Sequence, residues 1–174
     1  MLHQLSDGTR VRIRPVEPAD KPRLEIALAR LSRESVRRRF LAAKPSLSAA
    51  ELRYLTEVDG SQHIALVAVL DSDPEQIAAV ARCIRTEPGG EEAEFAIVVA
   101  DAVQGRGLGS VLATALAARA RAAGIRRFVA TTLADNAAVM HLIEGFATPS
   151  ELHIRPGGVR EIVADLGGCE RLAA

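Results

Sequence analysis

The sequence predicts an α/β fold of α+β character, with a mixed, mostly antiparallel sheet of about six to seven strands flanked by about four helices. Three observations predict it. Residues 63–99 contain three apolar runs separated by turn residues, which is typical of an antiparallel meander. Residues 108–124 change to an apolar spacing of three to four, which indicates a helix. Further strand-like runs lie near both ends of the chain, at 11–16 and 152–165.

The first elements are mainly helical. Alternating apolar and basic residues predict a strand over 11–16. An apolar stripe predicts a helix over 18–33, and a second short helix is expected over 36–43. Ser48 is followed three residues later by Glu51, the spacing of a capping box, so a third helix starts there.

The remaining elements alternate between strands and helices. Gly124 is a natural residue at which the helix from 108 ends. Asp135 or Asn136 can cap a short helix that runs to about residue 144. Strands are expected over 63–70, 76–85, 92–99, 127–132, 152–155 and 159–165.

Length and composition limit the classes of protein that fit. The chain has 174 residues, which suits a single domain spanning 1–174. Basic and acidic residues number 22 each, so no nucleic-acid partner is expected. No apolar run reaches the roughly 20 residues of a membrane span, and the first residues lack a signal pattern, so we expect a cytoplasmic protein. Two cysteines, Cys83 and Cys169, cannot form a four-ligand zinc site, and no metal is expected.

The most informative segment is a glycine-rich loop between a predicted strand and a predicted helix. It consists of Gln104, Gly105, Arg106, Gly107, Leu108, Gly109 and Ser110. Glycines let backbone N–H groups approach a ligand, and a helix N-terminus adds unpaired donors and a positive dipole end. Such a loop can bind a phosphate or pyrophosphate, and Arg106 could add a charged contact. The loop fits a P-loop or a Rossmann fingerprint poorly, and a tight turn without a ligand stays open.

The run from Gln104 to Gly109 resembles the Gln/Arg-x-x-Gly-x-Gly/Ala signature of the GCN5-related N-acetyltransferase (GNAT) superfamily. Asn136, and Gly145 with Phe146, also resemble residues of that family. The order of the elements matches over essentially the whole chain. Within the superfamily, the stretches at 7–15, 47–59 and 93–96 look like those of bacterial Pat-type protein lysine acetyltransferases.

The resemblance implies the GNAT fold, with acetyl-CoA as the acetyl donor and an amine as the acceptor. It implies that the segment from Ile97 through Val98 to Val99 contacts the pantetheine arm with its main chain. The loop from Gln104 to Ser110 would bind the pyrophosphate, and Asn136 would touch the cofactor arm. It also implies that the Val99 N–H polarises the thioester carbonyl.

Transfer to an amine needs a general base, because at neutral pH only about one lysine side chain in a thousand is unprotonated. Glu94 is the candidate that the Pat-type resemblance favours, and Glu92 is the alternative on the same strand face. Many family members have a tyrosine as general acid where this chain has Ile143. A CoA thiolate can leave without a strong acid, because thiols have a pKa near 8.5.

The function predicted from the sequence is therefore an acetyl-CoA-dependent N-acetyltransferase, an enzyme that acts on a primary amine of a protein lysine side chain. One alternative acceptor is a small amine or a peptide N-terminus. Another alternative is a catalytically silent module that binds acyl-CoA. The sequence leaves the oligomeric state open.

Overall fold

The structure is a computed structural model, and it describes residues 1–168. Eight strands form one sheet in the order β1-β2-β3-β4-β5-β6-β8-β7. The strands are β1 (Leu2–Gln4), β2 (Arg10–Pro15), β3 (His63–Leu70), β4 (Ile77–Arg85), β5 (Glu92–Val99), β6 (Arg127–Leu133), β7 (Thr148–Arg155) and β8 (Val159–Asp165). The α-helices are α1 (Lys21–Ala29), α2 (Arg33–Phe40), α3 (Ala49–Thr56), α4 (Leu108–Ala122) and α5 (Ala137–Glu144).

The mixed, mostly antiparallel sheet that the sequence predicts is confirmed. Neighbouring strands pair antiparallel except β5 and β6, which pair parallel. The described residues hold one strand more than expected, and their five α-helices compare with about four in the predicted fold class and five among the predicted ranges. The extra strand, β1, pairs with β2, and Leu2 lies opposite Arg12. It has three residues, which are too few to show the alternation of apolar and polar residues that predicts a strand.

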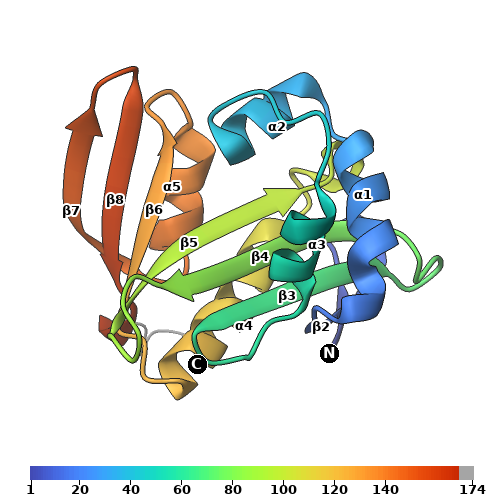
Figure 1. The fold of residues 1–174 in the computed structure, drawn as a ribbon, viewed down its shortest axis with the longest axis horizontal. Helices are drawn as coiled ribbons and strands as arrows, with labels where there is room; N and C mark the ends of the chain where they lie inside the picture. The colour runs from blue at the N-terminus through green and yellow to red at the C-terminus, as the bar shows by residue number, and fades with distance from the viewer. Residues whose placement is uncertain (169–174) are drawn as a thin grey trace.

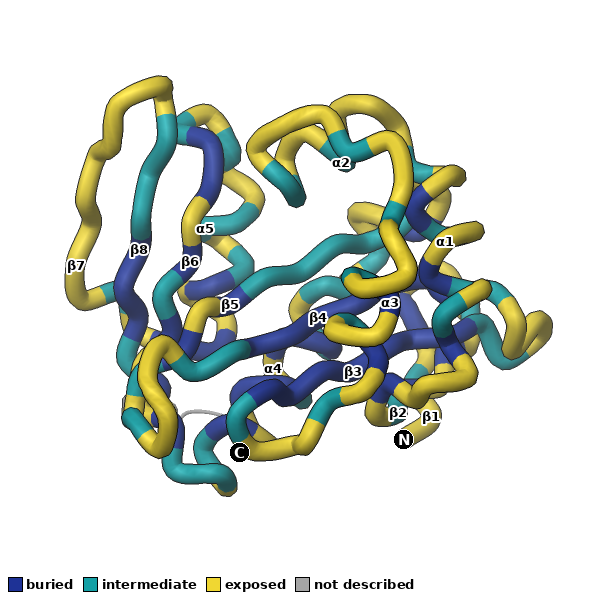
Figure 2. The backbone as a smooth tube through the Cα atoms, in the orientation of Figure 1, coloured by how far each residue is buried: buried dark blue, intermediate teal, exposed yellow. Residues whose placement is uncertain are grey.

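Helices cover both faces of the sheet (Figure 1). Along β3, Ile64, Leu66 and Ala68 belong to a core shared with α4 and α5. The intervening Ala65 and Val67 pack in a second core shared with α1 and α3. Side chains of a strand point alternately to the two faces, so a strand buried on both sides reads as a continuous apolar run. Figure 2 accordingly shows β3 and β4 as the buried centre of the molecule.

The N-terminal helices differ from the expected ranges. The segment expected as one helix over 18–33 divides into a short 3-10 turn at Pro18–Asp20 and α1, which ends at Ala29. Ser32 then caps α2 by accepting a hydrogen bond from the Ser35 N–H at 3.2 Å. A residue that caps a new helix has non-helical backbone angles, so the first helix cannot continue through it. The capping box of Ser48 and Glu51 is confirmed at the start of α3.

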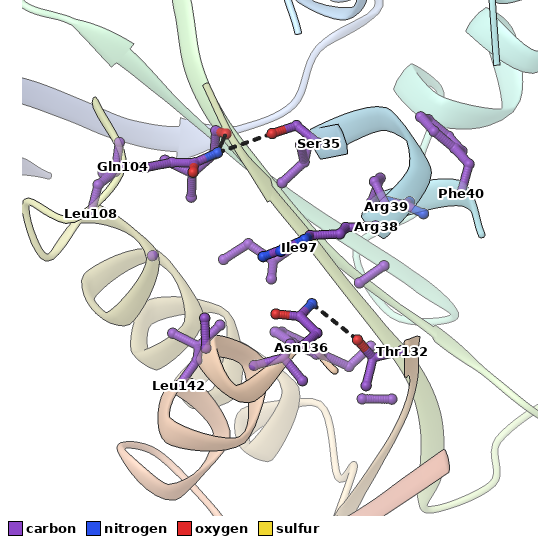
Figure 3. A pocket seen from close by; sticks show the side chains of 18 of the residues that line it. Ser35, Arg38, Arg39, Phe40, Ile97, Gln104, Leu108, Thr132, Asn136 and Leu142 are labelled. Carbon is purple, nitrogen blue, oxygen red and sulfur yellow. Dashed lines mark hydrogen bonds between the residues drawn. The ribbon is translucent and has the colours of Figure 1, made fainter. Parts of the chain in front are cut away.

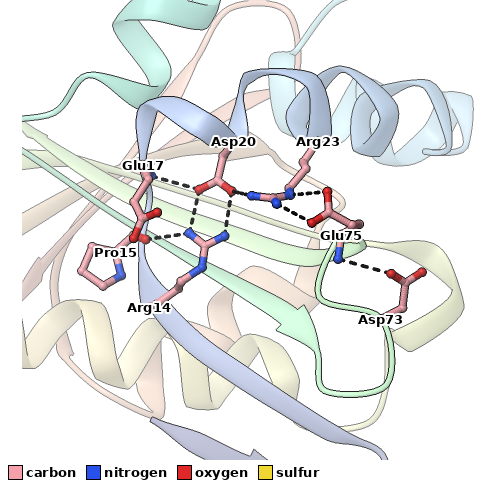
Figure 4. A network of polar contacts seen from close by, with 7 residues as sticks. All are labelled: Arg14, Pro15, Glu17, Asp20, Arg23, Asp73 and Glu75. Carbon is pink, nitrogen blue, oxygen red and sulfur yellow. Dashed lines mark hydrogen bonds and ion pairs between the residues drawn. The ribbon is translucent and has the colours of Figure 1, made fainter.

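A buried carboxylate joins the start of α1 to the sheet (Figure 4). Asp20 is fully buried and accepts two hydrogen bonds from the Arg14 guanidinium, both at 2.7 Å. It also accepts bonds from the Glu17 N–H at 2.9 Å and from Arg23 at 3.0 Å. Burial opposes ionisation of Asp20, but these donors outweigh it and hold the pKa of Asp20 below its ordinary value.

We expect Asp20→Asn to lower the free energy of unfolding by about 2 kcal/mol at neutral pH. The loss stays moderate because Arg23 retains its pairing with Glu75 and Arg14 retains the Pro15 carbonyl. A depressed folded-state pKa stabilises the fold above the unfolded value near 3.9, and this contribution is lost as the pH falls through the folded-state pKa. Urea unfolding of both proteins should therefore show a difference that shrinks below about pH 4. A constant difference would contradict the role given to the Asp20 charge.

Of the two cysteines, the described residues include one. Cys83 lies on β4 and is fully buried, and burial raises the pKa of its thiol to about 12. The thiol is therefore protonated at neutral pH. Cys169 lies outside the described residues. Over residues 1–168, no helix is at once long and apolar enough to cross a bilayer.

Candidate active site

The site begins where two parallel strands separate. β5 and β6 pair only from Glu92 with Arg127 to Glu94 with Val129, and beyond that point they diverge (Figure 1). A cavity of about 960 Å³ lies in the opening. It is bounded by the second half of β5, by β6, by the loop into α4, by α2 and by α5.

The divergence leaves backbone groups of β5 facing the cavity. The Ala100 N–H bonds to the Ala78 carbonyl of β4, so the even-numbered residues of β5 bond to β4. By the alternation of an antiparallel ladder, Ile97 and Val99 direct their N–H groups to the other side, where pairing with β6 has ended. These two N–H groups can therefore donate to a ligand in the cavity.

The glycine-rich loop lies at one end of the same cavity. Gly105 and Gly107 have φ angles of +72° and +85°, a region that L-residues with side chains rarely adopt. Gly107 occupies the N-cap position of α4, so the first N–H groups of this helix have no partner within it. The loop is therefore suited to bind an anionic group.

Polar side chains join the loop to α2. The Gln104 amide donates to the Val99 carbonyl at 2.9 Å and to the Ser35 hydroxyl at 3.2 Å (Figure 3). The Asp101 carboxylate accepts from the N–H and hydroxyl of Ser32, both at 2.8 Å, and from the Ser35 hydroxyl at 2.7 Å. Burial opposes ionisation of Asp101, but these donors hold its pKa below the usual value. The result is that α2 is held across the mouth of the cavity.

The structure brings together every sequence-predicted binding residue except Arg106. The residues that line the cavity are Ile97, Val98, Val99, Gln104, Gly105, Gly107, Leu108, Gly109, Ser110 and Asn136. Arg106 is not among the lining residues, and its guanidinium pairs with Asp7 before β2. An arginine already neutralised by a carboxylate has less to offer to a phosphate, so Arg106 is placed for attaching the loop to the N-terminal segment.

Asn136 lies at the start of α5 and faces the cavity. Its side-chain nitrogen donates to the Thr132 hydroxyl of β6 at 3.1 Å, which fixes the orientation of the amide (Figure 3). The carbonyl oxygen of the amide makes no hydrogen bond within the described part of the chain, so it can accept from a ligand. Ile143, seven residues on, is buried in the core and does not line the cavity.

The two candidate glutamates have different surroundings. Glu94 is exposed and lines the cavity, and its carboxylate makes no ion pair or hydrogen bond with residues 1–168. Glu92 does not line the cavity and lies 3.5 Å from the Arg127 guanidinium. Of the two, Glu94 alone can meet a molecule bound in the cavity.

Several further residues line the cavity, and most of them have only a weak signal in the sequence. Arg38, Arg39 and Phe40 come from α2, and Arg82 comes from β4. His141 of α5 also lines the cavity. In the sequence, the arginine run 37–39 is typical of a solvated helix face, and a site for the adenosine 3′-phosphate or for an acidic partner stays open. The packing of α2 against β5 brings Arg38, Arg39 and Phe40 to the site.

Comparison with known proteins identifies the family. A model of the acetyltransferase (GNAT) domain matches residues 10–146. Acetyltransferase Pat of Mycolicibacterium smegmatis is 35% identical over 141 residues, which are 81% of this chain and 42% of Pat. An acetyltransferase of Pseudomonas aeruginosa is 34% identical over 145 residues, 81% of this chain and 76% of that protein. The chain therefore spans less than half of Pat.

A solved structure agrees with these matches. The GNAT domain of Streptomyces lividans PAT superimposes with a TM-score of 0.84 at 34% identity. The match covers 95% of this chain and 96% of that domain. The divergent strands and the glycine loop agree with the family that the comparisons identify. The chain belongs to the GNAT acetyltransferase family.

Proposed function

We propose that this protein transfers the acetyl group of acetyl-CoA directly to a lysine side chain of another protein, with Glu94 as the general base. The observation that carries the proposal is the Glu94 carboxylate. It is exposed and unpaired within residues 1–168, and it lies on the wall of the cavity that also holds the glycine loop. Acceptor and donor can therefore meet in one space.

The residues of the cavity fit the parts of acetyl-CoA. A Cβ on Gly105 or Gly107 would meet no atom within 4 Å, so the backbone faces open space on this side. The unpaired N–H groups at the start of α4 suit the pyrophosphate. The open N–H groups of β5 and the Asn136 amide suit the amide groups of the pantetheine arm. Acetyl-CoA supplies a thioester, which an amine nitrogen attacks while the C–S bond breaks.

The two open N–H groups of β5 serve different parts of the donor. Val99 lies next to the loop that binds the pyrophosphate, and it is five residues from Glu94, about 16 Å along a strand. Ile97 is three residues from Glu94, about 10 Å along the strand. The thioester carbonyl must lie near the base that deprotonates the attacking amine. We therefore assign the Ile97 N–H, rather than the Val99 N–H favoured by the sequence, to the developing charge on the carbonyl oxygen.

Glu94 takes the proton that the amine must lose. The acceptor nitrogen approaches from the open side of the cavity and passes its proton to the carboxylate, directly or through one water. The Ile97 N–H stabilises the negative charge that develops on the thioester carbonyl oxygen. CoA leaves as a thiolate, which accepts a proton from solvent or from Glu94. No tyrosine lines the cavity among the described residues, which suits a leaving group that needs no strong acid.

A protein lysine is the acceptor that the open site favours. Glu94 is solvent-accessible, so a long side chain can reach it from a molecule that stays outside the cavity. The similarity to Pat and to the S. lividans PAT domain supports the same choice.

We expect the protein to acetylate an N-terminally blocked peptide with one lysine faster than a lysine-free peptide with a free N-terminus or a panel of small amines. The lysine side chain is long enough to reach Glu94 while its peptide stays outside. Mass spectrometry of the products identifies the modified nitrogen. Faster modification of N-termini or small amines would overturn the lysine assignment. A protein that binds acetyl-CoA but modifies none of them would be a silent acyl-CoA-binding module.

A further inference from the structure

Two arginines face the acceptor side of the cavity without an acidic partner. Arg39 at the end of α2 is half-buried, and Arg82 in the middle of β4 is only 5% exposed. Both line the cavity. The Arg82 Nη1 donates to the Leu55 carbonyl at 3.2 Å and contacts His63 Nε2 at 3.1 Å. Over residues 1–168, neither guanidinium makes an ion pair with a carboxylate.

Burial and a neighbouring positive charge dominate the electrostatic surroundings of Arg82. Burial, with the nearby Arg82 charge, lowers the pKa of His63 to about 4, so His63 is neutral at pH 7. Burial, with the nearby Arg39 charge, lowers the pKa of Arg82 to about 10, which still leaves it charged. Buried charges are normally paired, because an unpaired charge loses its hydration without compensation. A buried arginine next to a second arginine is therefore expected to have a partner from outside the described residues 1–168.

The pair lies beside the proposed base. Glu94 is directly opposite Ile84 in the antiparallel pairing of β5 with β4, and Arg82 is two residues from Ile84 on the same sheet face. Diagonal neighbours of this kind have Cβ atoms about 7 Å apart. An acceptor whose amine contacts Glu94 therefore has its neighbouring groups at the guanidinium of Arg82.

We propose that Arg39 and Arg82 form a subsite for a carboxylate that the acceptor carries close to its reactive amine. The inference rests on the proposed function and defines the acceptor more narrowly, as a lysine with an acidic residue beside it. A free amino acid would offer the same chemistry, an amine with a carboxylate. A free amino acid and a protein lysine are distinguished by comparing their rates of acetylation.

Arg38 provides a matched control. It lies on the same helix and also lines the cavity, but its Nε already donates to Glu34 at 2.6 Å. Arg38→Gln and Arg39→Gln make the same change in charge. Only the second removes a guanidinium that has no carboxylate partner within residues 1–168; it lies 4.9 Å from the centre of the Phe40 ring. Arg39→Lys is a milder second variant, because it retains the positive charge and loses the paired N–H donors of the guanidinium.

The experiment compares kcat/KM for matched acceptors. The first pair consists of two N-terminally blocked peptides, one with Asp and one with Asn beside the single lysine. The second pair consists of a free amino acid and its carboxamide. We expect the wild-type protein to prefer the Asp peptide by roughly 10- to 100-fold. Arg39→Gln should remove most of that preference, Arg39→Lys part of it, and Arg38→Gln should leave it within about twofold.

The outcomes separate this inference from the proposed function. Equal rates on Asp and Asn peptides in the wild-type protein overturn the subsite and leave lysine acetylation intact. Modification of the amino acid alone, with an Arg39-dependent preference over its carboxamide, supports the subsite and overturns the protein acceptor. If Arg39→Gln instead raises KM for acetyl-CoA but not for its 3′-dephospho form, the arginine binds the donor phosphate and the inference is wrong. No carboxylate preference on either pair also overturns it.

Discussion

Glu94→Gln is expected to lower kcat by about 10²- to 10⁴-fold, the range typical of a general base. The amide has nearly the shape of the carboxylate but cannot take a proton from the acceptor amine. Acetyl-CoA binding should hardly change, because Glu94 lies near the start of β5, whereas the glycine loop follows the end of that strand. Initial rates with a lysine peptide give kcat, and thermal unfolding with and without acetyl-CoA gives donor binding.

The pH dependence and a neighbouring glutamate supply the controls. Without the base, the rate depends on the fraction of the lysine amine that is already unprotonated. At pH values below the lysine pKa of about 10.4, this fraction increases about tenfold for each unit by which the pH is raised. The variant should therefore recover activity steadily as the pH increases. Glu92→Gln makes the same change in charge on the same strand, outside the cavity, and should retain most activity. Unchanged turnover in Glu94→Gln, or a larger loss in Glu92→Gln, would show that Glu94 is not the base.

Ile97→Pro is expected to lower kcat by about 100- to 1000-fold, the effect of removing one donor to a developing oxyanion. Proline has no N–H, and at this position the N–H is not used in pairing with β4. The substitution therefore removes the proposed donor while leaving the ladder intact. Peptide acetylation under saturating acetyl-CoA measures the loss.

Two further variants distinguish this donor from its neighbour and from its side chain. Ile97→Ala retains the N–H and loses only part of a side chain, so its kcat should remain near that of the wild type. Val99→Pro removes the other open N–H and should raise KM for acetyl-CoA more than it lowers kcat. A larger loss of kcat in Val99→Pro than in Ile97→Pro would return the oxyanion role to Val99. Circular dichroism and thermal unfolding report whether each variant is folded.

Local patterns were sufficient for much of the fold. The expected strands over 63–70 and 92–99 match β3 and β5, because continuous apolar runs between turns allow few other structures. The helix after the glycine loop ends as expected before Gly124, whose φ is +87°. The expected long helix over 18–33 was wrong, because its apolar stripe continues to Leu31, past the end of α1 at Ala29, and Ser32 then begins a new helix.

The sequence by itself determined the fold class and the position of the loop that we propose binds the donor, because both depend on residues adjacent in the chain. Tertiary structure decided which groups face the cavity. The Ile97 N–H is open only because β6 diverges beyond Val129, and Glu94 rather than Glu92 is free only because Arg127 lies beside Glu92. Arg39 and Arg82 line one cavity because α2 packs over β5, a contact between residues too distant in sequence to leave a periodic signal.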